Sequence, residues 1–208
     1  MNTTPLLRAL GGGIGWLLSP TRKTVDRLKR GDRRRRGRVL RMWSLGCLVV
    51  EGGGCLILLW LEQGVPSHKL DIISAVLIVY AYSRINEIAY AFYSDSLTQS
   101  KESDLKPLER IRMAMRSYWG LAFNFAILFY FLPLSGLFKE PLANFFESLY
   151  FSVVTMTTLG YGDVLPHHWL ARLLVMYEVI TGIILIAVAI ATYIGGINEA
   201  DATFTTSD

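Results

Sequence analysis

The sequence predicts an all-α membrane protein with four transmembrane helices and one shorter, re-entrant helix. Of its 208 residues, 52% are hydrophobic and only 18% are charged, a balance that favours a membrane protein over a soluble one. A helix needs roughly 20 apolar residues to cross the ~30 Å hydrocarbon core. Four long, nearly uncharged stretches meet that need: Val39–Leu61, Leu70–Tyr93, Tyr118–Leu134 and Trp169–Gly195. A fifth stretch, Ala143–Thr157, is too short to cross and predicts the re-entrant helix.

The positive charges predict how the chain is oriented. One group lies beside the first apolar stretch and consists of Arg30, Arg33, Arg34, Arg35, Arg36, Arg38 and Arg41. A second group lies between the second and third stretches and consists of Lys101, Lys106, Arg110, Arg112 and Arg116. Because cytoplasmic loops carry an excess of Lys and Arg, we expect both termini in the cytoplasm and the protein in a bacterial-type plasma (inner) membrane. The net charge of +4 is then a topology signal, and no nucleic-acid partner is expected.

The re-entrant helix has clear start and stop signals. Asn144 is followed three residues later by Glu147, the pattern of a capping box that opens a helix. We expect the helix to end near Thr157, and Pro166 to break the chain before the last long helix begins. The partial negative charge at the carboxyl end of a helix favours a cation there.

The loop after this helix predicts a cation-binding site built from the main chain. A narrow pore replaces the water around a dehydrated ion with rings of backbone carbonyls from several subunits. Successive carbonyls face one axis only if the backbone includes positive φ angles, which glycine tolerates and most residues do not. Gly160 and Gly162 fit those positions, and Tyr161 between them is expected to turn its ring outward. Thr158 is expected to add a carbonyl and a hydroxyl at the inner mouth.

The run Thr155-Met156-Thr157-Thr158-Leu159-Gly160-Tyr161-Gly162-Asp163 resembles the signature of the potassium channel pore-domain family, in which a Thr-x-Gly-Tyr-Gly core follows a pore helix. The resemblance covers roughly residues 117–197. It implies an outer helix, a pore helix, a filter loop and an inner helix, assembled as a homotetramer around one axis. It also implies K+ as the permeant ion, bound by the carbonyls of Thr158, Leu159, Gly160, Tyr161 and Gly162. The residues expected to support the filter are Thr155, Thr157, Asp163 and Glu178.

These patterns divide the chain into five segments. They are a basic cytoplasmic N-terminal segment (1–38), a transmembrane helical hairpin (39–93), a cytoplasmic linker (94–116), a potassium channel pore unit (117–197) and a cytoplasmic tail (198–208). Within the linker, residues 109–116 fit either an amphipathic helix on the membrane surface or a solvated entry into the third helix. Cys47 and Cys55 both fall inside the first helix, so neither a disulfide nor a metal site is expected.

Two departures from the family pattern affect the filter surroundings. Val154 stands where some bacterial relatives place a Glu that pairs with the filter aspartate, so Asp163 needs another partner or only water. Phe151 stands where many relatives have a Trp that hydrogen-bonds the filter tyrosine. Thr155 is therefore the best remaining partner for Tyr161.

The last helix carries two residues with open interpretations. Gly182 lies where similar channels often have a glycine about which the inner helix bends, although a glycine that merely permits close packing is an equal alternative. Glu178 lies one turn earlier and is expected to sit behind the pore helix and hydrogen-bond there. The alternative is that Glu178 lines the pore and adds negative field.

Charged residues inside the hairpin predict an ion pair, because an isolated charge in a spanning helix is costly. Glu51 and Arg84 reach similar depths in their helices and are expected to pair, with Glu87 as the competing i+3 partner of Arg84. Arg84 is the only Arg or Lys of residues 42–93 other than Lys69, so steep voltage gating by charge movement is not expected. The hairpin is interpreted as a peripheral scaffold or as a degenerate sensor of lipid or tension.

Three functions compete at this point. A potassium-selective channel is favoured, and a less selective cation channel is disfavoured because Tyr161 is kept. A non-conducting membrane subunit would leave the filter sequence free to decay. No nucleophile–base set or metal-ligand cluster indicates an enzyme. The expected partners are further copies of the chain, membrane lipid, and an unidentified gating ligand or subunit.

Overall fold

The structure is a computed structural model that describes residues 33–61, 70–97 and 107–205. These residues form helices, loops and one isolated β-bridge between Phe138 and Pro166, which confirms the predicted all-α class. The described helices are α3 (Arg33–Leu61), α4 (Leu70–Leu97), α5 (Pro107–Phe131), α6 (Phe145–Met156) and α7 (Trp169–Thr205).

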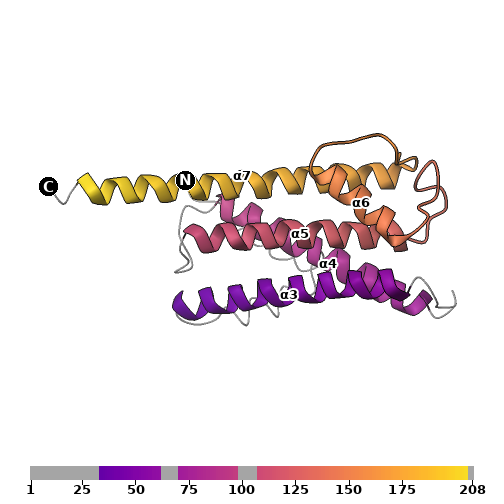
Figure 1. Cartoon of the computed structure of the whole chain (residues 1–208), viewed down its shortest axis with the longest axis horizontal. Coiled ribbons are helices and arrows are strands. Elements are labelled where there is room, and N and C mark those ends of the chain that lie inside the picture. The colour runs from indigo at the N-terminus through magenta and orange to yellow at the C-terminus, as the bar shows by residue number, and fades with distance from the viewer. Residues whose placement is uncertain (1–32, 62–69, 98–106, 206–208) are drawn as a thin grey trace, which may run out of the picture.

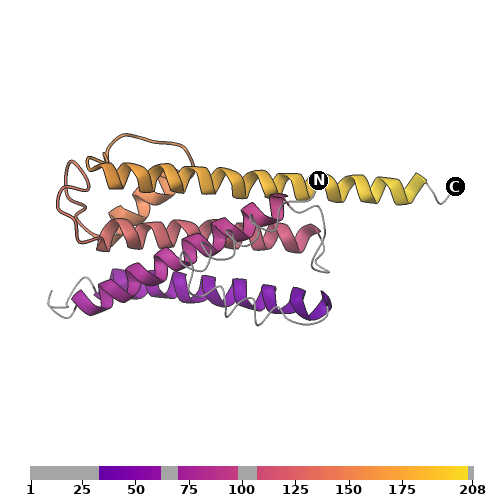
Figure 2. The same cartoon turned by 180° about the vertical axis from the view of Figure 1, so that it is seen from behind.

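Helix α5 is the centre of the bundle. It packs against each of the other four described helices, α3, α4, α6 and α7. Figure 1 shows α3, α5 and α7 running side by side, and Figure 2 shows α4 crossing the bundle on the opposite face. The short helix α6 is inclined between α5 and α7 at one end of the molecule (Figure 1). The middle of α5 is accordingly apolar on nearly all sides, with Leu121, Phe125 and Ala126 fully buried.

Three of the described helices are long and apolar enough to cross a membrane: Gly37–Leu59, Ile72–Phe92 and Trp169–Gly195. The fourth expected span lies in α5, which is 25 residues long but carries charges in its first turns, so composition alone does not mark it. These charged residues are Glu109, Arg110, Arg112 and Arg116. The apolar stretches of the sequence therefore located the helices of the bundle, and α6 is the short helix expected between the last two.

The helix ends extend beyond the apolar stretches. Helix α5 begins at Pro107, so residues 107–116 of the predicted linker form its first turns, whereas residues 94–97 of that linker end α4. Helix α3 begins at Arg33 inside the predicted N-terminal segment, and α7 runs to Thr205 through most of the predicted tail. Polar and charged residues such as Glu and Arg are good helix formers. Loss of apolar character therefore marks where the membrane is expected to end and does not mark where the helix ends.

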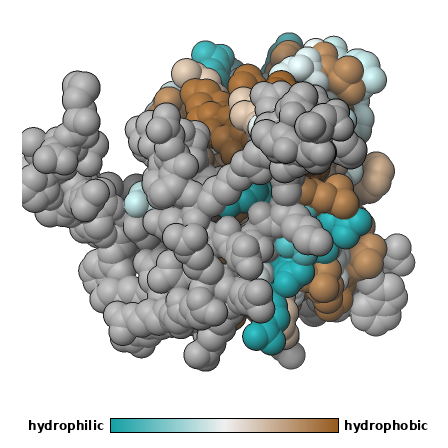
Figure 3. All heavy atoms as spheres, turned by 90° about the vertical axis from the view of Figure 1, so that its left-hand side faces the viewer, coloured by the Kyte–Doolittle hydropathy of each residue, from teal (hydrophilic) through white to brown (hydrophobic). Residues whose placement is uncertain are grey.

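The basic residues of the two groups that fall in the described helices α3 and α5 lie at the same end of the bundle. The N-terminal ends of α3 and α5 adjoin each other at the end opposite α6 (Figure 1). Arg41 of α3 forms an ion pair with Glu109 of α5 there. Figure 3 looks onto this end and shows both hydrophilic and apolar side chains among the described residues. This arrangement agrees with the expectation that both groups face one side of the membrane.

Candidate functional site

The start of α6 is fixed by its own capping residues. The Asn144 Oδ1 atom accepts a hydrogen bond from the Glu147 N–H at 2.8 Å, and Asn144 itself has an extended backbone. The Glu147 carboxylate accepts a hydrogen bond from the Ala143 N–H in return. Two backbone donors at the helix start are thereby satisfied. The predicted capping box is present, but the bond to the Glu147 carboxylate comes from the N–H of Ala143 and not from that of the N-cap residue Asn144.

The end of α6 leads directly into residues 158–163, the predicted filter loop. Thr157 is the C-cap, and its hydroxyl donates to the Val153 carbonyl at 2.7 Å. The next two backbone N–H groups bond back to the helix: Thr158 N–H donates to Thr155 O at 3.0 Å, and Leu159 N–H donates to Val154 O at 3.1 Å. These bonds fix the direction in which the chain leaves the helix, at the negative end of the helix dipole.

Helix α6 is held against α5 by two buried serines. The Ser148 hydroxyl donates to the Ala126 carbonyl at 2.7 Å, and the Ser152 hydroxyl donates to the Ala122 carbonyl at 2.9 Å. Phe151 adds an apolar contact, packing edge-on against Phe129 with ring centroids 5.2 Å apart. Since these bonds bridge two helices in a buried setting, they orient α6 and with it the loop that follows.

The filter loop has a left-handed backbone at every second residue. The φ angles are +58° at Thr158, +54° at Gly160 and +78° at Gly162. Alternation of this kind turns successive carbonyls toward one side of the chain. The expectation of positive φ holds at both glycines. Thr158 was not expected to have it, because a β-branched residue rarely adopts this conformation.

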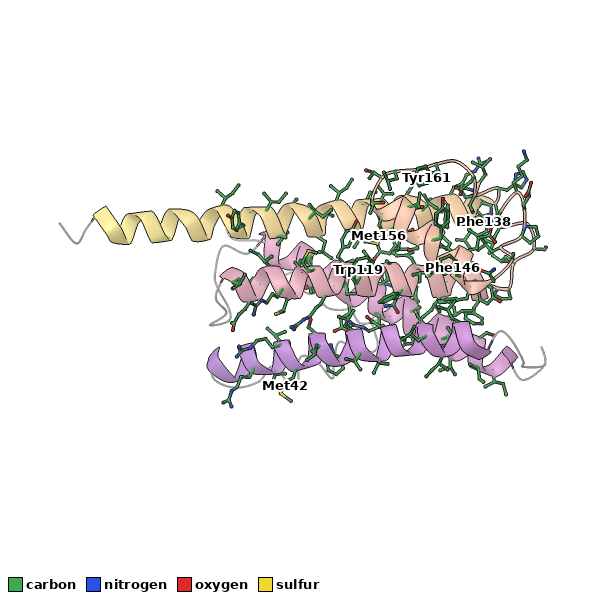
Figure 4. All side chains as sticks on the ribbon, in the orientation of Figure 1. Met42, Trp119, Phe138, Phe146, Met156 and Tyr161 are labelled. Carbon is green, nitrogen blue, oxygen red and sulfur yellow. The ribbon has the colours of Figure 1, made fainter. Side chains whose placement is uncertain are left out.

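The loop lies on the surface of the single subunit. Leu159 is 59% exposed and Tyr161 is 67% exposed. Figure 4 shows Tyr161 on the opposite edge of the subunit from Met42 of α3. A Cβ added at Gly160 or Gly162 would meet nothing within 4 Å. Among the described residues of this subunit, no hydrogen bond joins Thr155 to Tyr161, so that pairing stays a prediction.

Asp163 has a partner that the sequence did not suggest. The Tyr150 hydroxyl donates to Asp163 Oδ2 at 2.7 Å, and the Val164 N–H donates to Oδ1 at 3.1 Å. The hydrogen bond from Tyr150 lowers the pKa of Asp163, and the same bond raises the pKa of Tyr150. The signal that could have found Tyr150 is a hydroxyl-bearing ring beside Phe151, on the face of α6 turned toward the loop.

Removing this hydroxyl is expected to weaken the ionised form of Asp163. Because the pKa of Asp163 is lowered in the folded protein, its bond to Tyr150 is present above the ordinary aspartate value of ~3.9 and is lost as the pH falls through the lowered value. In Tyr150→Phe we expect Asp163 to titrate at higher pH, measured from its Cγ resonance in an NMR titration. Tyr193→Phe, at an exposed tyrosine of α7, is the control and should leave that titration unchanged. Equal titration curves in Tyr150→Phe and the native protein would contradict the assignment.

Glu178 and Gly182 both face the back of α6. Glu178 is fully buried, and its Oε1 atom is hydrogen-bonded to the Ser152 hydroxyl. A Cβ at Gly182 would lie 3.5 Å from the Met156 Cε atom and 3.9 Å from Tyr118 Cε2. Helix α7 continues unbroken through Gly182 in this conformation. The contacts are those of a closely packed glycine, and the bending role stays a prediction.

The hairpin contains a buried cluster of charges. Arg84 Nε lies 2.9 Å from Glu51 Oε1, and Arg84 Nη1 lies 2.9 Å from Glu87 Oε2, so Arg84 pairs with both expected partners at once. Trp43 Nε1 donates to Glu87 Oε1 at 2.9 Å. A Cβ at Gly120 would clash with Glu51 Oε2. The absence of a side chain at Gly120 therefore lets this cluster rest directly on α5.

The hairpin also touches the last helix. The Tyr177 hydroxyl of α7 donates to Asn86 Oδ1 of α4 at 3.0 Å. Asn86 in turn donates to the Tyr82 carbonyl at 2.8 Å. This polar contact between α4 and α7 was not predicted, because neither residue stands out in an apolar helix by charge or spacing.

Comparison with known proteins agrees with this geometry. Residues 117–196 match the family model described as "Ion channel". Two-pore potassium channel 1 of Arabidopsis thaliana is 34% identical over 85 residues, which cover 40% of this chain and 22% of that protein. The calcium-gated potassium channel TvoK of Thermoplasma volcanium is 30% identical over 92 residues, which cover 42% of this chain and 26% of that protein. The voltage-gated potassium channel Kch of Escherichia coli is 36% identical over 64 residues, which cover 31% of this chain and 15% of that protein.

The chain thus matches about a quarter or less of the length of each of these relatives. No solved structure matches it significantly. The matched segment is the one that contains α6, the filter loop and most of the apolar part of α7. Residues 117–196 are therefore similar to the ion-channel family, and the three relatives named above are potassium channels.

Proposed function

We propose that this chain is one subunit of a homotetrameric, potassium-selective channel. The observation that carries the proposal is the alternation of left-handed residues at Thr158, Gly160 and Gly162. A loop with this backbone presents a row of carbonyl oxygens and keeps its side chains away from that row. Such oxygens replace the hydration shell of a potassium ion. The ion would bind to the carbonyls of residues 158–162.

The exposed surface of the subunit supports assembly. One loop supplies one row of oxygens, and a cage around an ion requires several rows. Helix α7 presents large apolar side chains at helical spacing, and they are exposed in a single subunit: Leu173, Met176, Ile180, Ile183, Ile186 and Ile190. Leu159 and Tyr161 are exposed in the same way. Neighbouring subunits would cover these residues around the pore axis, while α3 and α4 would face lipid.

The membrane orientation follows from charge. The basic residues of α3 and α5 lie at the end of the bundle opposite the filter loop (Figure 1). With the positive-inside bias, this end is cytoplasmic and the filter opens to the outside. The protein is then a multi-pass membrane protein with both termini in the cytoplasm, in a bacterial-type plasma membrane.

The test of the proposed function is a selectivity measurement on the full chain. Purified protein is reconstituted into bilayers with potassium on one side and sodium on the other, and the reversal potential is recorded. We expect a reversal potential strongly displaced from zero in the direction that opposes potassium flow, and no current from protein-free bilayers prepared in the same way. A reversal potential near zero under this gradient would reject potassium selectivity, and a mass in detergent other than that of four chains would reject the tetramer.

A further inference from the structure

Glu178 lies in a setting that does not suit a negative charge. Its side chain is fully buried where α7 meets α6. Within the described residues Glu178 forms no ion pair, unlike Glu51 and Glu87, which both pair with Arg84. Its Oε2 atom has no hydrogen-bond partner within the described part of the chain. An ionised carboxylate buried in this way, without a cation, is strongly destabilised.

The neighbouring hydroxyl groups have too few protons to solvate a carboxylate. The Ser152 Oγ atom lies within hydrogen-bonding distance of both the Ala122 carbonyl and Glu178 Oε1. A serine hydroxyl has one proton, and a carbonyl oxygen only accepts. If Ser152 donates to Ala122, the contact between Ser152 and Glu178 needs a proton from Glu178.

The facing group on α5 does not supply that proton. Tyr118 is the titratable side chain of α5 that interacts electrostatically with Glu178. Its hydroxyl donates to the Met156 carbonyl at 3.0 Å, so its single proton is already engaged. On α6, the other buried serine, Ser148, donates to Ala126. With Ser152 donating to Ala122, the proton at the contact between Ser152 and Glu178 comes from the carboxyl group itself.

We propose that Glu178 is a protonated, neutral carboxylic acid in the folded protein and donates a hydrogen bond to Ser152. A chain of bonds then runs from Glu178 of α7 through the Ser152 hydroxyl of α6 to the Ala122 carbonyl of α5. Ser152 lies one turn before Met156, the last residue of α6, so this chain holds the turn that leads into the filter loop. Glu178 is thus a positioning residue that acts through α6, and this role does not depend on which ion the channel conducts.

The protonation state is measured directly in the native, full-length protein. Tyr177-Glu178 is the only Tyr-Glu pair in the sequence, so labelling tyrosine carbonyls with ¹³C and glutamate with ¹³C and ¹⁵N identifies Glu178 without any substitution. We expect its side-chain carboxyl resonance, in solid-state NMR of the reconstituted protein, at the position of a carboxylic acid at neutral pH. A resonance at the carboxylate position would overturn the proposal.

A pair of serine variants tests the hydrogen bond separately. Ser152→Ala removes the acceptor of the Glu178 proton, and we expect the carboxyl resonance of Glu178 to shift. Ser148→Ala is the matched control, because it removes an equally buried bond from α6 to α5 that does not reach Glu178. It is expected to leave the resonance in place while lowering stability to a similar degree. An unchanged resonance in Ser152→Ala would reject the bond even if the carboxyl group proves neutral.

Discussion

Replacing Gly160 with Ala is expected to abolish the potassium current of the reconstituted channel. Gly160 has a φ angle of +54°, and the left-handed conformation costs a residue with a Cβ roughly 1–2 kcal/mol. In a symmetric channel this cost recurs in every subunit at the same level of the filter. A relaxed backbone at residue 160 would rotate the adjoining carbonyl away from the axis. Single-channel recording of the variant in bilayers measures the loss.

Gly136 provides the control for this substitution. It also has a positive φ, +73°, and a Cβ there would meet nothing within 4 Å, as at Gly160. It lies in the loop between α5 and α6, outside the filter. Gly136→Ala therefore introduces comparable backbone strain and is expected to keep the current and its selectivity. Normal potassium current in Gly160→Ala, or the same loss in both variants, would mean that conduction does not depend on the filter backbone.

Replacing Arg84 with Met is expected to lower the free energy of unfolding by about 3–5 kcal/mol, the usual cost of removing one partner from a buried ion pair. Arg84 is buried and contacts Glu51 and Glu87 at once, so its loss leaves two carboxylates facing an apolar environment. Glu51 is the more deeply buried of the two, with 1% of its side chain exposed against 12% for Glu87. Unfolding by denaturant in mild detergent, followed by circular dichroism, measures the difference.

Arg41 is the matched control for the hairpin cluster. It also joins two helices by an ion pair with a glutamate, but its side chain is 44% exposed. Exposed pairs contribute only about 0.2–1 kcal/mol, so Arg41→Met is expected to change stability little. Adding Glu51→Gln to Arg84→Met should recover part of the loss, because it removes one of the unpaired charges. Equal losses in the free energy of unfolding for Arg84→Met and Arg41→Met would show that burial does not determine how much the Arg84 cluster contributes to stability.

The local features of the filter region could be predicted because they depend on short-range rules. A capping box at Asn144 and a glycine at each left-handed position are determined by neighbouring atoms, so the residue types alone indicate them. The positive φ of Thr158 was not predicted, because its left-handed backbone is imposed by the hydrogen bonds at the end of α6 and not by its own side chain.

Contacts between distant segments were harder to predict. The pairing of Glu51 with Arg84 was expected because opposite charges in apolar helices have few other partners that could neutralise them. The bonds from Tyr150 to Asp163 and from Tyr177 to Asn86 involve uncharged groups, which many positions could satisfy equally well. Only the angle at which the helices pack selects those partners. The start of α5 at Pro107 was left open by the sequence for a different reason, since apolar periodicity reports burial and not helix length.

The central position of α5 determines how the surrounding bilayer acts on this protein. The helices with the most exposed apolar faces are α3, α4 and α7, whereas the middle of α5 is enclosed. A change in bilayer thickness or lateral pressure would therefore first tilt α3 and α4, the helices proposed to face lipid. Part of that displacement would reach the turn before the filter by way of α5, through the Ser148 and Ser152 hydroxyls. The response of the protein to its lipids should then depend on two serine side chains that no lipid touches.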